Sequence, residues 1–104
     1  NLTGLHIMTL TCNDWANKSG TSDRECKCGS WKAHWLSQSG KNWPTQCSID
    51  GCSSSPTLGA HIYNASETGE YIAPFCDACN KKTGKFNLKT GVTLVSANKK
   101  STCG

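Results

Sequence analysis

Alternating apolar and polar residues mark the extended segments of this chain. In residues 4–12 (GLHIMTLTC), Leu5 and Ile7 point to one side and His6 and Met8 to the other, which predicts a strand. Residues 70–76 (EYIAPFC) form a short extended run. In residues 85–98 (KFNLKTGVTLVSAN) two alternating stretches flank Thr90-Gly91, which predicts a hairpin.

One helix stands out. Residues 30–40 (SWKAHWLSQSG) begin with Ser30, a good N-cap, and end with Gly40, a good C-cap. Trp31 and Trp35 are one turn apart on the same face. We interpret residues 41–60, and the polar stretch after Cys12, as loops, and residues 76–84 as a turn that opens a short helix. The expected fold is α+β, with short antiparallel strands and one or two short helices.

Composition adds a need for cross-links. The chain has 104 residues, of which 36% are hydrophobic, and eight are cysteines. This length predicts a single domain spanning residues 1–104, with a core small enough to need disulfides or a metal. No apolar run of about 18 residues exists, so no transmembrane helix is expected.

The start of the chain and its sequons indicate secretion. The chain begins at an asparagine without a signal sequence, as a processed mature protein does. Three Asn-x-Ser/Thr sequons are candidate glycosylation sites, at Asn1, Asn17 and Asn64. Together with the cysteine content they predict an extracellular, disulfide-containing glycoprotein.

Two closely spaced cysteine pairs predict a metal site. Cys47 and Cys52 form the first pair, and Cys76 and Cys79 the second, with the knuckle spacing C-x-x-C. Zinc prefers four tetrahedral ligands, and thiolates suit it. A disulfide across C-x-x-C closes a small, strained ring, and such bridges tend to be redox-active. We therefore expect a structural zinc ion.

This stretch resembles the treble-clef zinc fingers of the HNH nuclease superfamily. The resemblance covers residues 47–82: a cysteine pair, then GAHI, then YIAPFCDACNKK. It implies zinc at the four cysteines, His61 as the general base and Asn80 as a ligand of a catalytic metal. The acidic residue that precedes the histidine in the family is Ala60 here, and the middle asparagine position falls at or near Tyr71. The resemblance thus implies an HNH-like fold with an incomplete nuclease site. Alternatively, His61 is a buried or zinc-binding histidine and Asn80 a turn residue.

The other four cysteines are Cys12, Cys26, Cys28 and Cys103. Cys26 and Cys28 point to opposite sides of an extended segment, which favours two different partners. If the first and last strands pair, Cys12 comes near Cys103. The pairing is then 12–26 with 28–103, or 12–28 with 26–103. Four disulfides without a metal are the alternative to zinc with two disulfides.

The tryptophans suggest either a core or a binding surface. Trp31, Trp35 and Trp43 are the candidate ligand-binding residues, because indoles stack on sugar rings and bases. Trp43, next to a proline in a polar loop, is the one expected to be exposed. The competing role is to fill the core.

These features favour a secreted, zinc- and disulfide-stabilised binding protein with a glycan, microbial-surface or protein ligand. A nucleic-acid partner is disfavoured, because Arg24 is the only arginine in a chain of net charge +4. The alternatives are a metal-dependent HNH-type endonuclease with His61 as the base, and an antimicrobial or toxin-like defence protein. The last ranks lowest, because no basic amphipathic helix is present.

Overall fold

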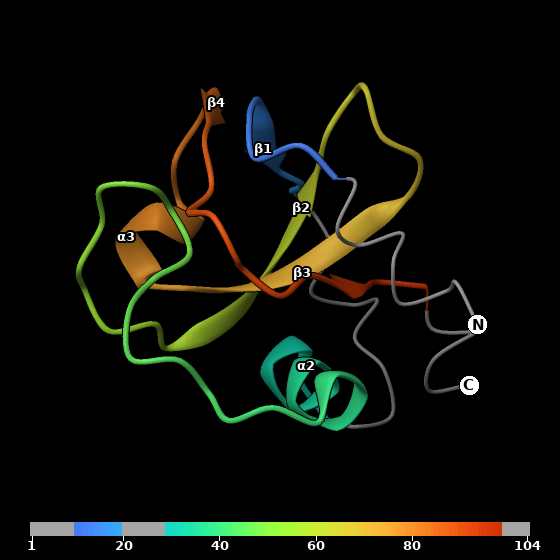
Figure 1. Cartoon of the computed structure of the whole chain (residues 1–104), viewed down its shortest axis with the longest axis vertical. Helices are drawn as coiled ribbons and strands as arrows, with labels where there is room; N and C mark the ends of the chain where they lie inside the picture. The colour runs from blue at the N-terminus through green and yellow to red at the C-terminus, as the bar shows by residue number, and fades with distance from the viewer. Residues whose placement is uncertain (1–9, 20–28, 99–104) are drawn as a thin grey trace.

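The computed structural model describes residues 10–19 and 29–98. They form a five-stranded antiparallel sheet in the order β4-β1-β2-β3-β5, with two helices (Figure 1). The elements are β1 (Trp15–Asn17), α2 (Trp31–Ser39), β2 (Leu58–Tyr63), β3 (Glu70–Phe75), α3 (Asp77–Asn80), β4 (Lys85–Phe86) and β5 (Val95–Ser96). This is a small, cysteine-rich domain, and its elements agree with the predicted α+β class.

Helix α2 confirms the predicted helix and its caps. The Ser30 hydroxyl accepts a hydrogen bond from the Ala33 amide at 3.0 Å. Gly40 ends the helix with φ 66°, a left-handed conformation that costs glycine little, and its N–H donates to the Leu36 carbonyl. The buried face of α2 carries Trp31 and Trp35, which pack with Ile72 and Val95.

The β2–β3 hairpin is the centre of the sheet. Six residue pairs join the two strands, among them His61 opposite Ile72. Because successive side chains alternate between faces, His61 and Ile72 lie towards α2. Ala60 and Ile62 lie on the opposite face, in a second core cluster that contains Cys47, Cys76 and Cys79. Helix α2 and the cysteines therefore lie on opposite faces of the sheet.

Gly59 of β2 lies where α2 crosses the sheet. A Cβ atom at this position would lie 2.6 Å from the Trp31 carbonyl carbon and 2.7 Å from the Lys32 amide nitrogen. These are backbone atoms that no side-chain rotation can move away. The missing side chain is what allows the helix to approach the strand this closely.

One hairpin prediction and two loop predictions were wrong. Residues 85–98 do not form a hairpin: β4 pairs with β1, and β5 pairs with β3. Trp15–Asn17 form β1 within a stretch expected to be a loop, and β2 begins at Leu58, inside the predicted loop 41–60. Of the strand predicted at residues 4–12, only residues 10–12 are described, and they are not in a strand. The expected contact of that strand with the end of the chain lies outside the described residues.

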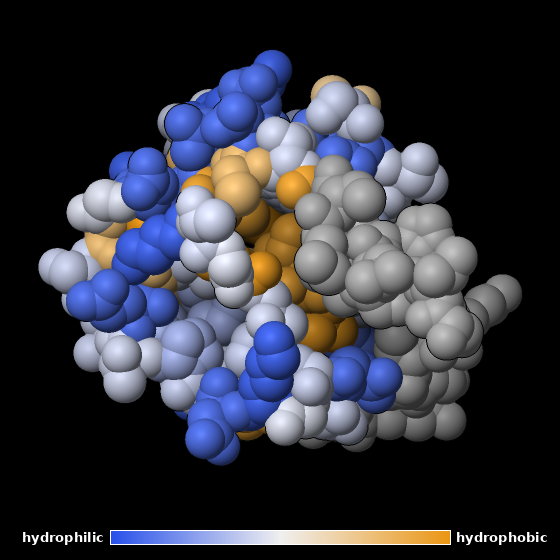
Figure 2. All heavy atoms as spheres, viewed as in Figure 1, coloured by the Kyte–Doolittle hydropathy of each residue, from blue (hydrophilic) through white to orange (hydrophobic). Residues whose placement is uncertain are grey.

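Part of the apolar core is visible at the molecular surface. In Figure 2, hydrophobic atoms are visible in the middle of the face shown, with hydrophilic side chains to the left and below. Tyr63, 40% exposed, is the exposed large hydrophobic residue of the described part of the chain. Most large apolar side chains are thus already used inside the protein.

Candidate metal centre

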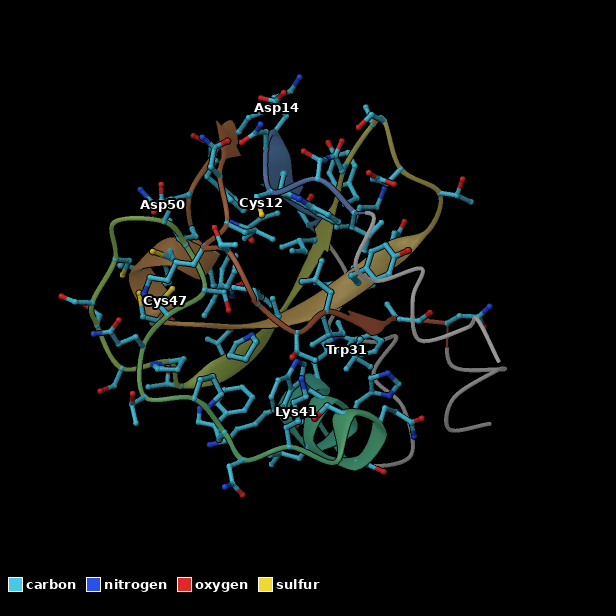
Figure 3. All side chains as sticks on the ribbon, in the orientation of Figure 1. Cys12, Asp14, Trp31, Lys41, Cys47 and Asp50 are labelled. Carbon is cyan, nitrogen blue, oxygen red and sulfur yellow. The ribbon has the colours of Figure 1, made fainter. Side chains whose placement is uncertain are left out.

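The four predicted zinc ligands come together in the structure. The sulfur atoms of Cys47, Cys52, Cys76 and Cys79 all lie within 4.8 Å of one another. Two come from the loop that precedes the β2–β3 hairpin, and two from the first turn of α3, which follows it. In Figure 3 the sulfur atoms, with Cys47 labelled, gather beside α3.

Local turns aim these sulfur atoms at one point. The Cys52 amide donates to the Ile49 carbonyl at 3.0 Å, and Gly51 takes φ 87°, so the chain reverses between Cys47 and Cys52. In the second pair the Asn80 amide donates to the Cys76 carbonyl at 3.0 Å, which closes one helical turn. A helical turn brings residues three apart to the same side, so Cys76 and Cys79 face the loop together.

The sulfur spacing fits a tetrahedral metal. The Cys52 and Cys76 sulfur atoms are 3.8 Å apart. Four sulfurs at the usual zinc–sulfur distance would be separated by about 3.8 Å. A disulfide needs about 2.05 Å, so these atoms are not bonded to each other. An all-sulfur set suits zinc or iron and does not suit magnesium or calcium, which prefer oxygen.

The four thiols differ in environment. Cys47, Cys76 and Cys79 are at most 7% exposed, whereas Cys52 is half-buried. The N–H of Ser54 donates to Cys52 and lowers the pKa of its thiol to about 7. Burial raises the pKa of Cys47 and, strongly, that of Cys79. Cys52 therefore ionises before Cys47 and Cys79, and a bound cation would favour ionisation of these two.

A lysine from outside the cluster holds the first cysteine loop. Lys89 Nζ donates to the carbonyls of Cys47 at 2.7 Å and Cys52 at 2.5 Å, and to Gln46 Oε1 at 3.2 Å. The Lys89 amide also donates to the Ser48 carbonyl at 2.9 Å. Sequence analysis missed this residue, because nothing in the local pattern links position 89 to the loop.

Asn17 fixes the second cysteine pair. Its Nδ2 donates to the carbonyls of Cys79 at 2.9 Å and Lys82 at 3.1 Å. The sequon at Asn64 is similarly engaged: Asn64 is 4% exposed, and its Nδ2 donates to the Asn13 carbonyl at 2.7 Å. Both amides thus have roles inside the fold, and neither favours an attached glycan. Asn1 lies outside the described residues.

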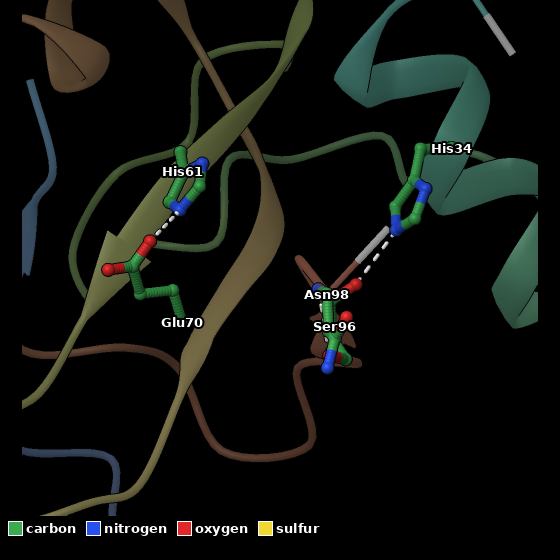
Figure 4. A network of polar contacts seen from close by, with 5 residues as sticks. All are labelled: His34, His61, Glu70, Ser96 and Asn98. Atoms are coloured by element: carbon green, nitrogen blue, oxygen red, sulfur yellow. Dashed lines mark hydrogen bonds and ion pairs between the residues drawn. The ribbon is translucent and has the colours of Figure 1, made fainter. Parts of the chain in front are cut away.

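His61 has a carboxylate partner on the α2 face. Its Nε2 lies 2.5 Å from Glu70 Oε1 across the hairpin (Figure 4). Its ring packs edge-on against Trp31, with centroids 5.1 Å apart. Nearby, His34 Nε2 lies 2.8 Å from the Ser96 carbonyl; a carbonyl only accepts, so this nitrogen carries the proton. His61 and Glu70 line a cavity of about 420 Å³.

The structure does not place His61 and Asn80 on the same side of the sheet. Asn80 follows Cys79 on α3, and Cys79 packs with Ala60 and Ile62 on the face opposite His61. Glu70 is the partner that sequence reasoning missed. The available signal was the hairpin register, which sets Glu70 next to His61 diagonally across the strands.

The candidate binding tryptophans are mostly core residues. Trp31 is 6% and Trp35 2% exposed. Trp43 is half-buried: its Nε1 donates to the Pro56 carbonyl at 2.8 Å, and its ring packs against Trp35 and lies 4.7 Å from Lys32 Nζ. Of the three indoles, only that of Trp43 has a substantial exposed surface.

Cys12, predicted to form a disulfide with Cys26 or Cys28, has no cysteine partner among the described residues, so this pairing stays a prediction. Its sulfur lies 3.9 Å from the Lys89 carbonyl. Among residues 10–19 and 29–98 no two sulfur atoms are within bonding distance. Cys26, Cys28 and Cys103 lie outside the described residues.

Comparisons with known proteins found no match. A scan against protein-family models, a search of curated proteins and a search of solved structures each gave no match. Within the described residues no helix has the length and apolar character needed to cross a membrane.

Proposed function

We propose that this chain is a small binding protein whose fold is held by a structural zinc ion in a treble-clef arrangement. The ligands would be Cys47, Cys52, Cys76 and Cys79. The order of elements supports this arrangement: a cysteine loop, the β2–β3 hairpin and then a helix that begins at the second cysteine pair.

The convergence of four protein thiols on one point is the observation that carries the zinc centre of this proposal. A catalytic zinc site keeps one position open for water or substrate, whereas a site with four protein ligands is closed. A metal held here would therefore stabilise the fold without taking part in chemistry. Three of the four thiols are buried in the core, as expected for a structural centre.

Binding rather than hydrolysis is the better-supported activity. A nuclease of the HNH type needs a second metal next to its general base, yet His61 is paired with Glu70 and faces α2, and position 60 is alanine. Outside the core the described chain instead offers a mixed polar surface with lysines. Secretion and glycosylation stay predictions.

Two measurements test the proposal. The first is metal content by elemental analysis, with thiols titrated under denaturant in the presence of a chelator. We expect one zinc ion per chain, with the four ligand thiols becoming reactive when the chelator removes it. A chain without metal would overturn the proposed metal centre. Iron in place of zinc would change the identity of the metal.

The second measurement separates binding from hydrolysis. Purified protein is applied to glycan and protein arrays, and in parallel to plasmid DNA with magnesium or manganese. We expect array binding and intact plasmid. If the unmodified protein nicks the plasmid and the His61→Ala variant leaves it intact, the protein is a nuclease instead. Nicking by both proteins would indicate a contaminant.

A further inference from the structure

We propose that a groove beside the metal centre binds an acidic sugar unit, one that carries a carboxylate or sulfate on a hydroxylated ring. This inference rests on the proposed binding function and names its ligand class. The lysine groove, as we call it, is lined by residues from segments 41–48 and 89–93 together with Trp35 and Pro74. Lys41 and Cys47, labelled in Figure 3, belong to its first wall.

The lysine groove has the size of a small-molecule site. Its volume is about 430 Å³. Ligand pockets span roughly 300–1,000 Å³, and a site near the lower end holds a ligand of one or two sugar rings. All of the residues named above belong to the described part of the chain.

The two walls are tied together, so the groove exists before a ligand arrives. Lys41 Nζ donates to Thr93 Oγ1 at 2.8 Å, and Trp35 Nε1 donates to the Thr93 carbonyl at 3.0 Å. Further along, Lys89 from the second wall bonds to Gln46 and Cys47 of the first. A preformed site avoids the ordering cost that weakens binding.

The charge of the groove selects an anion. Its described lining contains Lys41 and Lys89 and no aspartate or glutamate. The ammonium of Lys89 donates its three N–H groups to three protein oxygens, and the thiolates of a loaded metal centre would offset its charge, so Lys41 is the cation that remains for a ligand. Lys41 is exposed, and its contact with Thr93 uses one of three N–H groups, which leaves two for a ligand.

The neutral lining suits a sugar ring. Amide and hydroxyl groups come from Asn42, Thr45, Gln46 and Thr90, and apolar surface from Pro44 and Val92. Such a mixture matches the alternating hydroxyl and C–H surface of a sugar. A nucleobase would need an aromatic face for stacking, but the indole in this lining, Trp35, is 2% exposed. The described lining residues also include no arginine for bidentate phosphate contacts.

The test uses the zinc-loaded full chain and two matched probes, a trisaccharide of galacturonic acid and the neutral galactose trisaccharide. Binding is followed by calorimetry and by amide chemical shifts. We expect the acidic probe to bind, with shift changes in residues 41–48 and 89–93, and the neutral probe to bind more weakly. A sulfated galactose trisaccharide shows whether sulfate replaces carboxylate.

Variants separate a specific contact from general charge. Lys41→Gln should weaken binding of the acidic probe about fivefold, the effect of one exposed ion pair. Lys85→Gln removes the same charge from exposed β4 and should leave binding unchanged. Equal losses in both variants would overturn the assignment.

Failure of this inference and failure of the proposed function are distinguishable. If the acidic probe binds but its shifts lie around Trp31 and Glu70, the binding function stands and the lysine groove is not the site. If no acidic sugar binds while another array ligand does, the ligand class is wrong. If no array ligand binds, the proposed function itself fails.

Discussion

Lys89 Nζ donates a hydrogen bond to the Cys47 carbonyl at 2.7 Å, from a segment 42 residues further along the chain. The same ammonium bonds to the Cys52 carbonyl. One cation thus holds both ends of the loop that carries the first two candidate ligands. A zinc ion with four thiolates has a net charge of about −2, so a nearby ammonium also offsets that charge.

Replacing this lysine should weaken the metal centre. In Lys89→Gln we expect zinc affinity to fall about tenfold, because loss of an outer-shell partner typically costs 10- to 100-fold in metal affinity. Competition with a chromophoric chelator measures this affinity. Lys85→Gln, which removes an exposed lysine of β4, is the matched control and should bind zinc as the unmodified chain does. Equal affinity in both variants would show that Lys89 has no such role.

Removal of one candidate ligand should remove the metal. Cys76→Ser should lower the zinc content from one per chain to near zero and the melting temperature by about 10 °C, because a structural metal contributes directly to folding free energy. Cys12→Ser is the control, since among the described residues Cys12 has no cysteine partner and belongs to no metal-binding group. If both variants keep their zinc, the metal lies elsewhere.

In the metal-free protein, Cys52 should react faster than Cys47 and Cys79. The lowered pKa of Cys52, about 7, leaves roughly half of it as thiolate at pH 7, and this fraction decreases as pH falls below 7. The raised pKa values of Cys47 and Cys79 keep both as thiols in this range. Brief treatment with iodoacetamide followed by peptide mass spectrometry should label Cys52 before Cys47 and Cys79, and should label it more slowly at pH 6. In denaturant, Cys47, Cys52 and Cys79 should react at similar rates. If Cys52 still reacted fastest there, its reactivity would come from the local sequence and not from the fold.

The contact between α2 and the sheet depends on Gly59. Gly59→Ala would place a methyl group 2.6 Å from the Trp31 backbone, so the helix must move. We expect a loss of about 2–3 kcal/mol in the free energy of unfolding, as for other overpacked positions. Urea unfolding of the zinc-loaded chain measures it. Thr57→Ala, an exposed neighbour, should change stability by less than about 0.5 kcal/mol. An unchanged Gly59→Ala variant would mean that the helix can shift freely.

Sequence alone was sufficient where the determinants are local. Ser30 and Gly40 cap α2 within a few residues of its ends, and the spacing within each cysteine pair reflects a single turn. For these features the interacting groups are close along the chain, so their pattern can be recognised without knowledge of the fold.

It was insufficient where the partner is distant. The alternation in residues 85–98 marks extended chain correctly at Lys85–Phe86 and Val95–Ser96 but does not say what pairs with it, and each strand joins a different neighbour. The sequence predicts Gly59 to be a loop residue, whereas in the structure it packs closely against α2. Trp15, fully buried in β1, stands in a polar stretch whose pairing depends on tertiary contacts.

The strand order has a consequence for how the chain folds. The β2–β3 hairpin joins neighbouring segments, and both cysteine pairs flank it, so closing this hairpin also brings the metal ligands together at little loop-closure cost. β1 instead lies between β2 and β4, both of which come much later in the chain, so its pairing closes two long loops. We therefore expect the segment from Cys47 to Asn80 to acquire hydrogen-exchange protection first, and β1 to be the last piece of the sheet to become protected.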